Sequence, residues 1–167
     1  KIIGFSFDLP KATYDKKGSN GLKKWKTVRE AIGDLPALKA GEEYVDETGK
    51  IHNHKCAGLS DINLKRIKAI RANGGSRNGL PKSLILDCHK KKDKEGNVFS
   101  GHGDVYGIMD PDKPSPTITG GCLCYSKGRY GHYSQDRAIS IREAARLQTF
   151  PDDFNFSNSL TDSALQI

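Results

Sequence analysis

The chain is best interpreted from one stretch, Arg137-Ala138-Ile139-Ser140-Ile141-Arg142-Glu143-Ala144-Ala145-Arg146-Leu147-Gln148-Thr149-Phe150-Pro151-Asp152-Asp153-Phe154. Within it, Ser140 and Glu143 form a capping-box pattern, in which each side chain accepts a hydrogen bond from the other residue's backbone N–H. Apolar residues follow at helical spacing. Pro151 ends the pattern, because the residue before a proline disfavours helical geometry. The stretch therefore predicts a helix over residues 140–150.

Two arginines, Arg142 and Arg146, lie four residues apart on one face of this helix. Like charges at that spacing destabilise a helix by about 0.2–0.5 kcal/mol unless another group neutralises them. The candidates for neutralisation are Glu143, Asp152, Asp153 and a phosphate. We favour the internal partners, and we expect a structural brace formed by Arg137, Arg142, Glu143 and Arg146.

Composition and charge bound the possible functions. The 167 residues suffice for one ordinary domain, and 35% hydrophobic content with 18 Gly and 7 Pro indicates long irregular connections around a modest core. Residues 1–100 hold 21 of the 27 Lys and Arg residues and only 12 of the 20 Asp and Glu residues. This basic half favours a polyanionic partner, although a solvated basic surface is the alternative. No apolar run approaches the roughly 20 residues of a membrane helix, so we expect no membrane contact.

Local patterns predict several further elements. Thr27 and Glu30 form a second capping box, which opens a short helix that Gly33 and Pro36 close. A longer helix is expected from Ser60 or Asp61 to about Ala72. Strands are expected at residues 1–8, 43–45, 50–52, 83–88, 104–109 and 117–125. The mixed order predicts an α+β domain with a small mixed, mainly antiparallel sheet, a few short helices and long Gly-rich loops.

The stretch 137–154 resembles the ninth conserved motif of the DNA (cytosine-5) methyltransferases. Pro114-Ser115-Pro116-Thr117-Ile118-Thr119-Gly120-Gly121 is similar to the sequence around the threonine-containing dipeptide in the family's target recognition region. Weaker similarities cover residues 1–7, 27–36, 59–81 and 165–167. The resemblance implies that residues 1–8 are the last strand at the edge of the catalytic domain. It implies that residues 9–167 are the target recognition domain, including the motif-nine helix 140–150.

The resemblance also implies a chemistry that this chain does not contain. In the family, a cysteine in a Pro-Cys pair attacks C6 of a flipped-out cytosine, a glutamate assists, and S-adenosylmethionine delivers a methyl group to C5. No proline precedes any of Cys56, Cys88, Cys122 and Cys124, and neither Glu-Asn-Val nor a Gly-rich cofactor loop occurs. We therefore expect S-adenosylmethionine to serve the full-length enzyme. We expect no catalytic, cofactor-binding or metal residue in this chain, which alone should be inactive.

What remains is recognition of double-stranded DNA. The resemblance places the recognition loops at about residues 100–114 and 120–133. Glycines there let the backbone approach DNA closely, cations reach phosphates or guanine edges, and hydroxyls bind phosphate. The candidate DNA-binding residues are His102, Tyr106, Lys113, Thr117, Thr119, Gly120, Gly121, Lys127 and Arg129. For each glycine, a plain turn is the alternative.

Two positions depart from the family pattern. Bacterial members often carry Arg where this chain has Ile108, and often Pro where it has Tyr133. An apolar side chain cannot donate a hydrogen bond to guanine or phosphate. Either another cation takes that role, or the position does not read bases in this protein.

Other function classes remain open at this point. His52-Asn53-His54-Lys55-Cys56, Cys88-His89 and Cys122-Leu123-Cys124 could supply zinc ligands, although their spacing matches no structural zinc pattern. A non-enzymatic nucleic-acid-binding module, for example one that binds RNA, would need exposed aromatic residues on strands, for which Tyr106 and Tyr125 are candidates.

The wider context follows from the resemblance. A first residue other than Met and an end at Ile167 suggest a piece of a longer chain, whose catalytic domain would be a partner of this one. We expect a monomer in the bacterial cytoplasm, associated with the nucleoid and part of a restriction–modification system. The base sequence that it recognises cannot be read from the chain, because loop side chains have no portable code.

Overall fold

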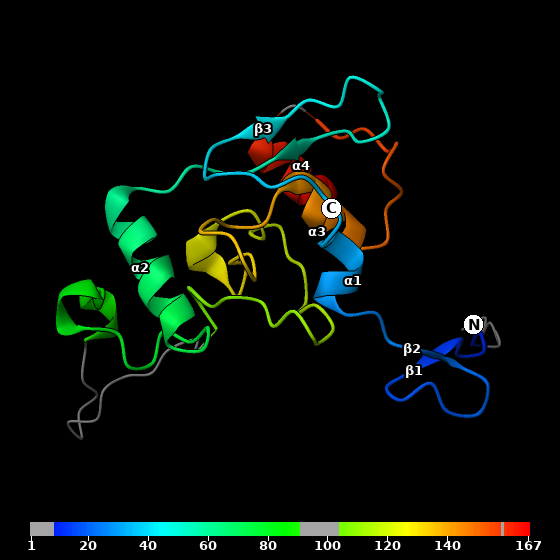
Figure 1. The fold of residues 1–167 in the computed structure, drawn as a ribbon, viewed down its shortest axis with the longest axis horizontal. Helices are drawn as coiled ribbons and strands as arrows, with labels where there is room; N and C mark the ends of the chain where they lie inside the picture. Colours follow the sequence, from blue (N-terminus) through cyan, green and yellow to red (C-terminus); the bar gives the residue numbers. More distant parts are fainter. Residues whose placement is uncertain (1–8, 91–103, 158) are drawn as a thin grey trace, which may run out of the picture.

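The computed structural model describes residues 9–90, 104–157 and 159–167 (Figure 1). The expected strand at 1–8, with the domain boundary after it, and the candidate His102 lie outside the described residues. The α+β class is confirmed: short helices combine with two small two-stranded sheets.

The two capping boxes predicted from sequence both open helices. Helix α1 spans Val28–Ile32 and helix α3 spans Ile141–Leu147. In α3, the Ser140 N–H donates to Glu143 Oε2 at 2.7 Å and the Glu143 N–H donates to Ser140 Oγ at 3.0 Å. These bonds satisfy N–H groups that a helix N-terminus otherwise leaves without partners.

Helix α3 ends earlier than residue 150. Thr149 has φ of +69°, the left-handed conformation that terminates many helices. The Phe150 N–H donates back to the Ala145 carbonyl and the Thr149 N–H to the Arg146 carbonyl, each at 3.0 Å. This bonding is a Schellman motif, so the chain leaves the helix one turn before Pro151 requires it.

The long helix is confirmed as α2, Asp61–Ala72, with Ile67 and Ile70 buried. Gly74 and Gly75, with φ of +70° and +82°, follow its end. A further helix that the sequence analysis missed, α4, spans Leu160–Gln166. Its local signal was Ser159, whose hydroxyl accepts from the Asp162 N–H at 3.3 Å.

The sheets are smaller than expected. Strands β1 (Tyr14–Asp15) and β2 (Lys23–Lys24) pair in parallel, and β3 (Glu43–Tyr44) pairs with β4 (His54–Lys55) in antiparallel fashion. The prediction of a second hairpin strand at 50–52 is wrong. The carboxylate of Asp46 accepts from the N–H groups of Thr48, Lys50 and Ile51 at 2.8–3.0 Å, which holds that segment in a turn.

The strands expected at 83–88, 104–109 and 117–125 do not form. Residues 82–84, 87–89 and 125–127 are 3₁₀ turns, named η1 (Lys82–Leu84), η2 (Asp87–His89) and η3 (Tyr125–Lys127). Tyr106 has φ of +61°, which is incompatible with an extended strand. Around Cys122 and Cys124 the backbone N–H groups bond to carbonyls three residues earlier, as in successive turns. In these segments the alternating apolar residues are buried or partly buried from turns and loops, so the alternation did not indicate strands.

Two apolar clusters hold these elements. One joins α1, α3 and α4 and includes Val28, Ile141 and Ala164. The other packs α2 against residues 105–138 through Ile70 and Ile108. In Figure 1 the connecting segment 104–131, in yellow and green, lies between α2 on one side and α1 and α3 on the other.

Candidate nucleic-acid interface

A buried ion pair anchors the segment that follows the candidate loops. Arg137 and Glu143 are 0% and 1% exposed, and the two guanidinium nitrogens donate to the two carboxylate oxygens at 2.6 and 2.7 Å. Burial alone would raise the pKa of Glu143. The hydrogen bonds and positive charge of Arg137 outweigh burial, so the pKa lies below its usual value and the carboxylate stays ionised. Arg137 also donates to the carbonyls of Leu38 and Ala138, which ties distant segments together.

Two buried histidines flank this pair. His132 Nδ1 accepts from the N–H groups of Ser134 and Gln135 at 3.1 and 3.0 Å, so the ring proton sits on Nε2, 3.5 Å from Glu143 Oε1. Burial lowers the pKa of His132 to about 4, so at neutral pH this contact involves a neutral imidazole. His54 bonds to the Pro36 carbonyl at 2.7 Å and to Ser140 Oγ at 2.9 Å, and burial lowers its pKa as well.

The arginine pair of α3 contacts protein groups. Arg142 is fully buried and donates to the carbonyls of His52 and Pro151, each at 2.7 Å, and of Phe154. Arg146 forms a bidentate pair with Asp152, both bonds at 2.7 Å, and also contacts Asp34. The hydrogen bonds from Arg146 lower the pKa of Asp152. Sequence reasoning named Asp152 in advance, but not the carbonyls. It also did not name Asp34, which is 112 residues away from Arg146 along the chain.

One arginine of α2 reaches the loop that precedes Arg137. Arg71 donates to the carbonyls of His132, Tyr133 and Gln135 at 2.6–3.2 Å, and its Nε bonds to Asp136 Oδ1 at 3.1 Å. The sequence analysis placed Arg71 near the end of the expected helix and gave it no partner. Neither spacing nor composition could show that it caps a loop more than 60 residues away.

The Thr-Ile-Thr segment is held by a tyrosine. The hydroxyl of Tyr130 donates to the Thr117 carbonyl at 3.1 Å and lies 3.0 Å from Thr119 Oγ1. Gly128 is required beneath this ring, because a Cβ there would lie 2.4 Å from Tyr130 Cε2. The threonine side chains remain exposed on the surface.

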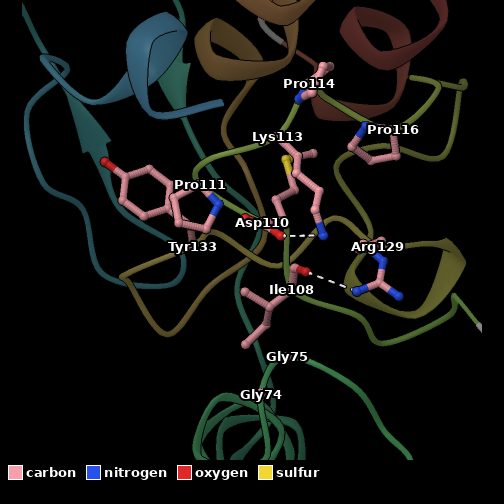
Figure 2. A pocket seen from close by; sticks show the side chains of 11 residues that line it. Gly74, Gly75, Ile108, Asp110, Pro111, Lys113, Pro114, Pro116, Arg129 and Tyr133 are labelled. Carbon is pink, nitrogen blue, oxygen red and sulfur yellow. Dashed lines mark hydrogen bonds and ion pairs between the residues drawn. The ribbon is translucent and has the colours of Figure 1, made fainter. Parts of the chain in front are cut away.

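Two adjoining cavities open on this surface, with volumes of about 600 and 620 Å³. Both are lined by Pro116 and Arg129. One also includes Lys113 and Tyr133, and the other includes Thr117 and Lys127. Figure 2 shows the Arg129 guanidinium directed toward the Ile108 carbonyl, with Lys113 bonded to Asp110. We call the two cavities together the Arg129 groove.

The structure thus brings four candidates, Lys113, Thr117, Lys127 and Arg129, to one groove. Thr119 bonds to Tyr130 near its edge. Gly120 and Gly121 lie beside a smaller cavity of about 260 Å³ that Lys127 and α4 also line.

Tyr106 is placed elsewhere. It is 9% exposed, and its ring packs edge-on against Tyr125 at 5.3 Å. Neither ring can stack on a base without leaving the core, so both are poor candidates for the RNA-binding alternative. We therefore drop Tyr106 from the surface that could contact DNA.

Sequence reasoning missed Asp104, which lines the groove and whose Oδ1 accepts from Arg129 Nη2 at 3.0 Å. The only available signal was an acidic residue inside a loop expected to bind DNA. Ile108, the departure from the family pattern, is buried, and its carbonyl accepts from Arg129 Nη1 at 3.4 Å. A cation, Arg129, therefore stands beside the position that departs from the expected family pattern.

Within residues 9–90, 104–157 and 159–167, no three His, Cys, Asp or Glu side chains converge as ligands of an ion would. No helix in this same part of the chain has the length and apolar character needed to cross a membrane.

Comparison with known proteins identifies the family. The family described as C-5 cytosine-specific DNA methylase matches residues 2–167. The type II methylase M.HgiDII of Herpetosiphon aurantiacus is 44% identical over 133 residues, which are 80% of this chain and 35% of that protein. The type II methyltransferase M.NgoFVII of Neisseria gonorrhoeae is 32% identical over 165 residues, 98% of this chain and 37% of that protein. DNA (cytosine-5)-methyltransferase 3 of Arabidopsis thaliana is 32% identical over 160 residues, 84% of this chain and 11% of that protein.

The chain spans only about a third of the length of these bacterial relatives. The match nevertheless runs over nearly all of its own residues. The chain therefore belongs to the C-5 cytosine-specific DNA methylase family.

Proposed function

We propose that this chain is the DNA-recognition part of a DNA (cytosine-5) methyltransferase, which binds double-stranded DNA while a separate catalytic domain modifies the base. The Arg129 groove is the observation that carries the proposal. It gathers the cations Lys113, Lys127 and Arg129 and the hydroxyl of Thr117 around two adjoining cavities. Lysine and arginine neutralise phosphates, and arginine also reads base edges in the major groove.

The buried ion-pair network supports these loops from behind. Arg137 and Glu143 fix the segment that follows Tyr130 and Gly131, and Arg142 and Arg146 fix the turn after α3. We propose that these four residues act as the brace of the recognition region. They are buried or partly buried and bonded to protein groups, so their contribution to DNA binding is indirect.

The Arg129 groove does not fit S-adenosylmethionine. This cofactor carries a sulfonium cation, but each carboxylate of the Arg129 groove already pairs with a cation, Asp104 with Arg129 and Asp110 with Lys113. Since no cysteine in the sequence follows a proline, the nucleophile of the family is also not in this chain. We assign methyl transfer, and the cofactor, to the remainder of the enzyme.

The proposed setting is a monomeric bacterial enzyme of a restriction–modification system, in the cytoplasm at the nucleoid. The names of the bacterial relatives, a type II methylase and a type II methyltransferase, support the restriction–modification part of this proposal.

Salt-dependent binding tests the proposal. Fluorescence anisotropy with a labelled duplex of random sequence should show weak binding that falls by about 10-fold between 50 and 200 mM salt, as expected for about two phosphate contacts. Lys127→Ala should reduce affinity and flatten the dependence on salt. An exposed lysine remote from the groove, Lys39→Ala, provides the matched control. Affinity that does not respond to salt would contradict the proposal.

A further inference from the structure

We infer that Arg129 and Asp104 together read the major-groove edge of a G·C base pair, and that Lys127 rather than Arg129 contacts phosphate. The inference rests on the proposed function and assigns separate tasks to the groove residues. It follows from how the guanidinium is held before any DNA is bound.

Arg129 is positioned from three sides. Its Nη2 and Nε bond to Asp104 Oδ1 at 3.0 and 3.4 Å, and its Nη1 to the Ile108 carbonyl at 3.4 Å. Its stem lies on Gly107, where a Cβ would stand 2.9 Å from Arg129 Cγ. The side chain is 34% exposed, so it is neither buried nor free to sample many rotamers. Because the side chain is already ordered, it loses less conformational entropy when DNA binds.

The remaining hydrogen-bonding capacity matches one base pair. A guanidinium has five N–H donors, and the three bonds of Arg129 leave one donor on each terminal nitrogen. Two such donors match O6 and N7 of guanine. Asp104 is 77% exposed, and among the described residues its Oδ2 has no hydrogen-bond partner. A carboxylate oxygen accepts from the N4 amino group of cytosine.

The same pair is a poor phosphate site. A phosphate at Arg129 would stand next to the Asp104 carboxylate, and like charges there repel. Lys127 lies in the same groove, is exposed, and forms no ion pair with any described residue. Its stem is aligned by Gly121, where a Cβ would meet Lys127 Cδ at 2.7 Å. Lys127 is thus available to the DNA backbone, and the Arg129–Asp104 ion pair is available to a base edge.

The test uses the complete gene product that contains this chain. A pool of duplexes with randomised sequence is methylated, and the modified sites are mapped by bisulfite conversion and sequencing. Arg129→Lys keeps the charge but loses the planar fork, so preference for guanine at one position of the site should fall about 10-fold to 100-fold. Affinity for duplexes without a site should stay within about two-fold.

Two further variants separate the roles. Asp104→Asn removes the repelling charge, so affinity for site-free DNA should rise while preference for the same base pair falls. Lys127→Ala should weaken binding equally for all sequences. The matched controls are Arg29→Lys and Asp112→Asn, which alter another exposed arginine–aspartate pair, 3.2 Å apart, outside both groove cavities. Thermal melting confirms that each variant is folded.

The outcomes distinguish the inference from the function on which it rests. The inference is supported if Arg129→Lys and Asp104→Asn both lose preference for G·C at the same single position of the methylated site. The control variants should keep that preference. The inference is overturned if both variants methylate the same base sequences as wild type with the same preferences. It is also overturned if Arg129→Lys lowers affinity equally for all DNA sequences. If the wild-type gene product neither binds nor methylates DNA, the proposed function itself fails.

Discussion

At the scale of single residues, the Arg137–Glu143 pair shows how burial turns a modest interaction into an essential one. Exposed ion pairs contribute little, because water already solvates both charges. Here both partners are out of water, so each charge depends on the other. The capping box in α3 therefore differs physically from its counterpart in α1, although the sequence patterns look the same.

Arg137→Met should destabilise the fold by about 3–5 kcal/mol, because it leaves the Glu143 carboxylate buried without a cation. Urea denaturation followed by circular dichroism measures the free energy of unfolding. The matched control is Glu30→Gln in the exposed capping box of α1, which should cost far less. If the two variants lose the same free energy of unfolding, the buried pair contributes no more to stability than the exposed capping box.

His132 should make stability depend on mildly acidic pH. Its folded pKa of about 4 lies below the ordinary value of 6.5, so between these values the unfolded chain binds a proton that the folded chain does not. The free energy of unfolding should therefore fall by about 3 kcal/mol as the pH drops from 6.5 to 4. His54, whose pKa burial also lowers, acts in the same direction.

His132→Asn should flatten this dependence between pH 4.5 and 6.5, where the shifted carboxylates Glu143 and Asp152 contribute little, since their pKa values lie below this window. Unfolding curves at several pH values measure the slope. A variant whose slope equals that of wild type would rule out His132 as its source.

At the scale of elements, helix propensity and capping explain why α1, α2 and α3 form, but not how they are joined. The joining is done by side chains that cap carbonyls of remote loops. Arg71 at the end of α2 and Arg142 in α3 both act in this way. An arginine suits the task because its five donors can serve several carbonyls at once.

Arg71→Ala should release the loop 132–136 from α2 and destabilise the protein by about 2–3 kcal/mol. Arg71→Lys should restore only part of the loss, because an ammonium group lacks the planar fork. Hydrogen exchange should show faster exchange at the backbone N–H groups of Ser134 and Gln135. Lys68→Ala, an exposed position on the same helix, is the control. Unchanged protection of the loop in Arg71→Ala would contradict the proposed tie.

At the scale of the whole molecule, the chain presents the Arg129 groove, but its sequence contains no Pro-Cys pair. The 167-residue chain should transfer no methyl group to DNA from tritiated S-adenosylmethionine, because none of its four cysteines stands in a Pro-Cys pair. The complete gene product under the same conditions is the positive control. Tritium incorporation by the isolated chain above a no-protein blank would refute this prediction.

The sequence alone determined the features that depend on hydrogen bonds between residues close together in the chain. Both capping boxes, the helix 61–72 and its glycine stop follow from hydrogen bonds within one or two turns. The family that the stretch 137–154 led us to expect is confirmed by the match over residues 2–167. The Asp46 turn and the Schellman end of α3 are also local, but they compete with patterns that indicate a strand or a longer helix. Period and propensity therefore misplaced these boundaries.

Only the tertiary structure decided the arrangement of residues 104–131. Their apolar alternation is compatible with strands, but Tyr106, Cys122 and Tyr125 are buried from turns, and their surroundings come from α2, α1 and α3. The partners of Arg71, the histidines around Glu143 and the pairing of Asp104 with Arg129 are likewise contacts between distant segments. Sequence spacing carries no record of such contacts, because they form only when the packed clusters bring those segments together.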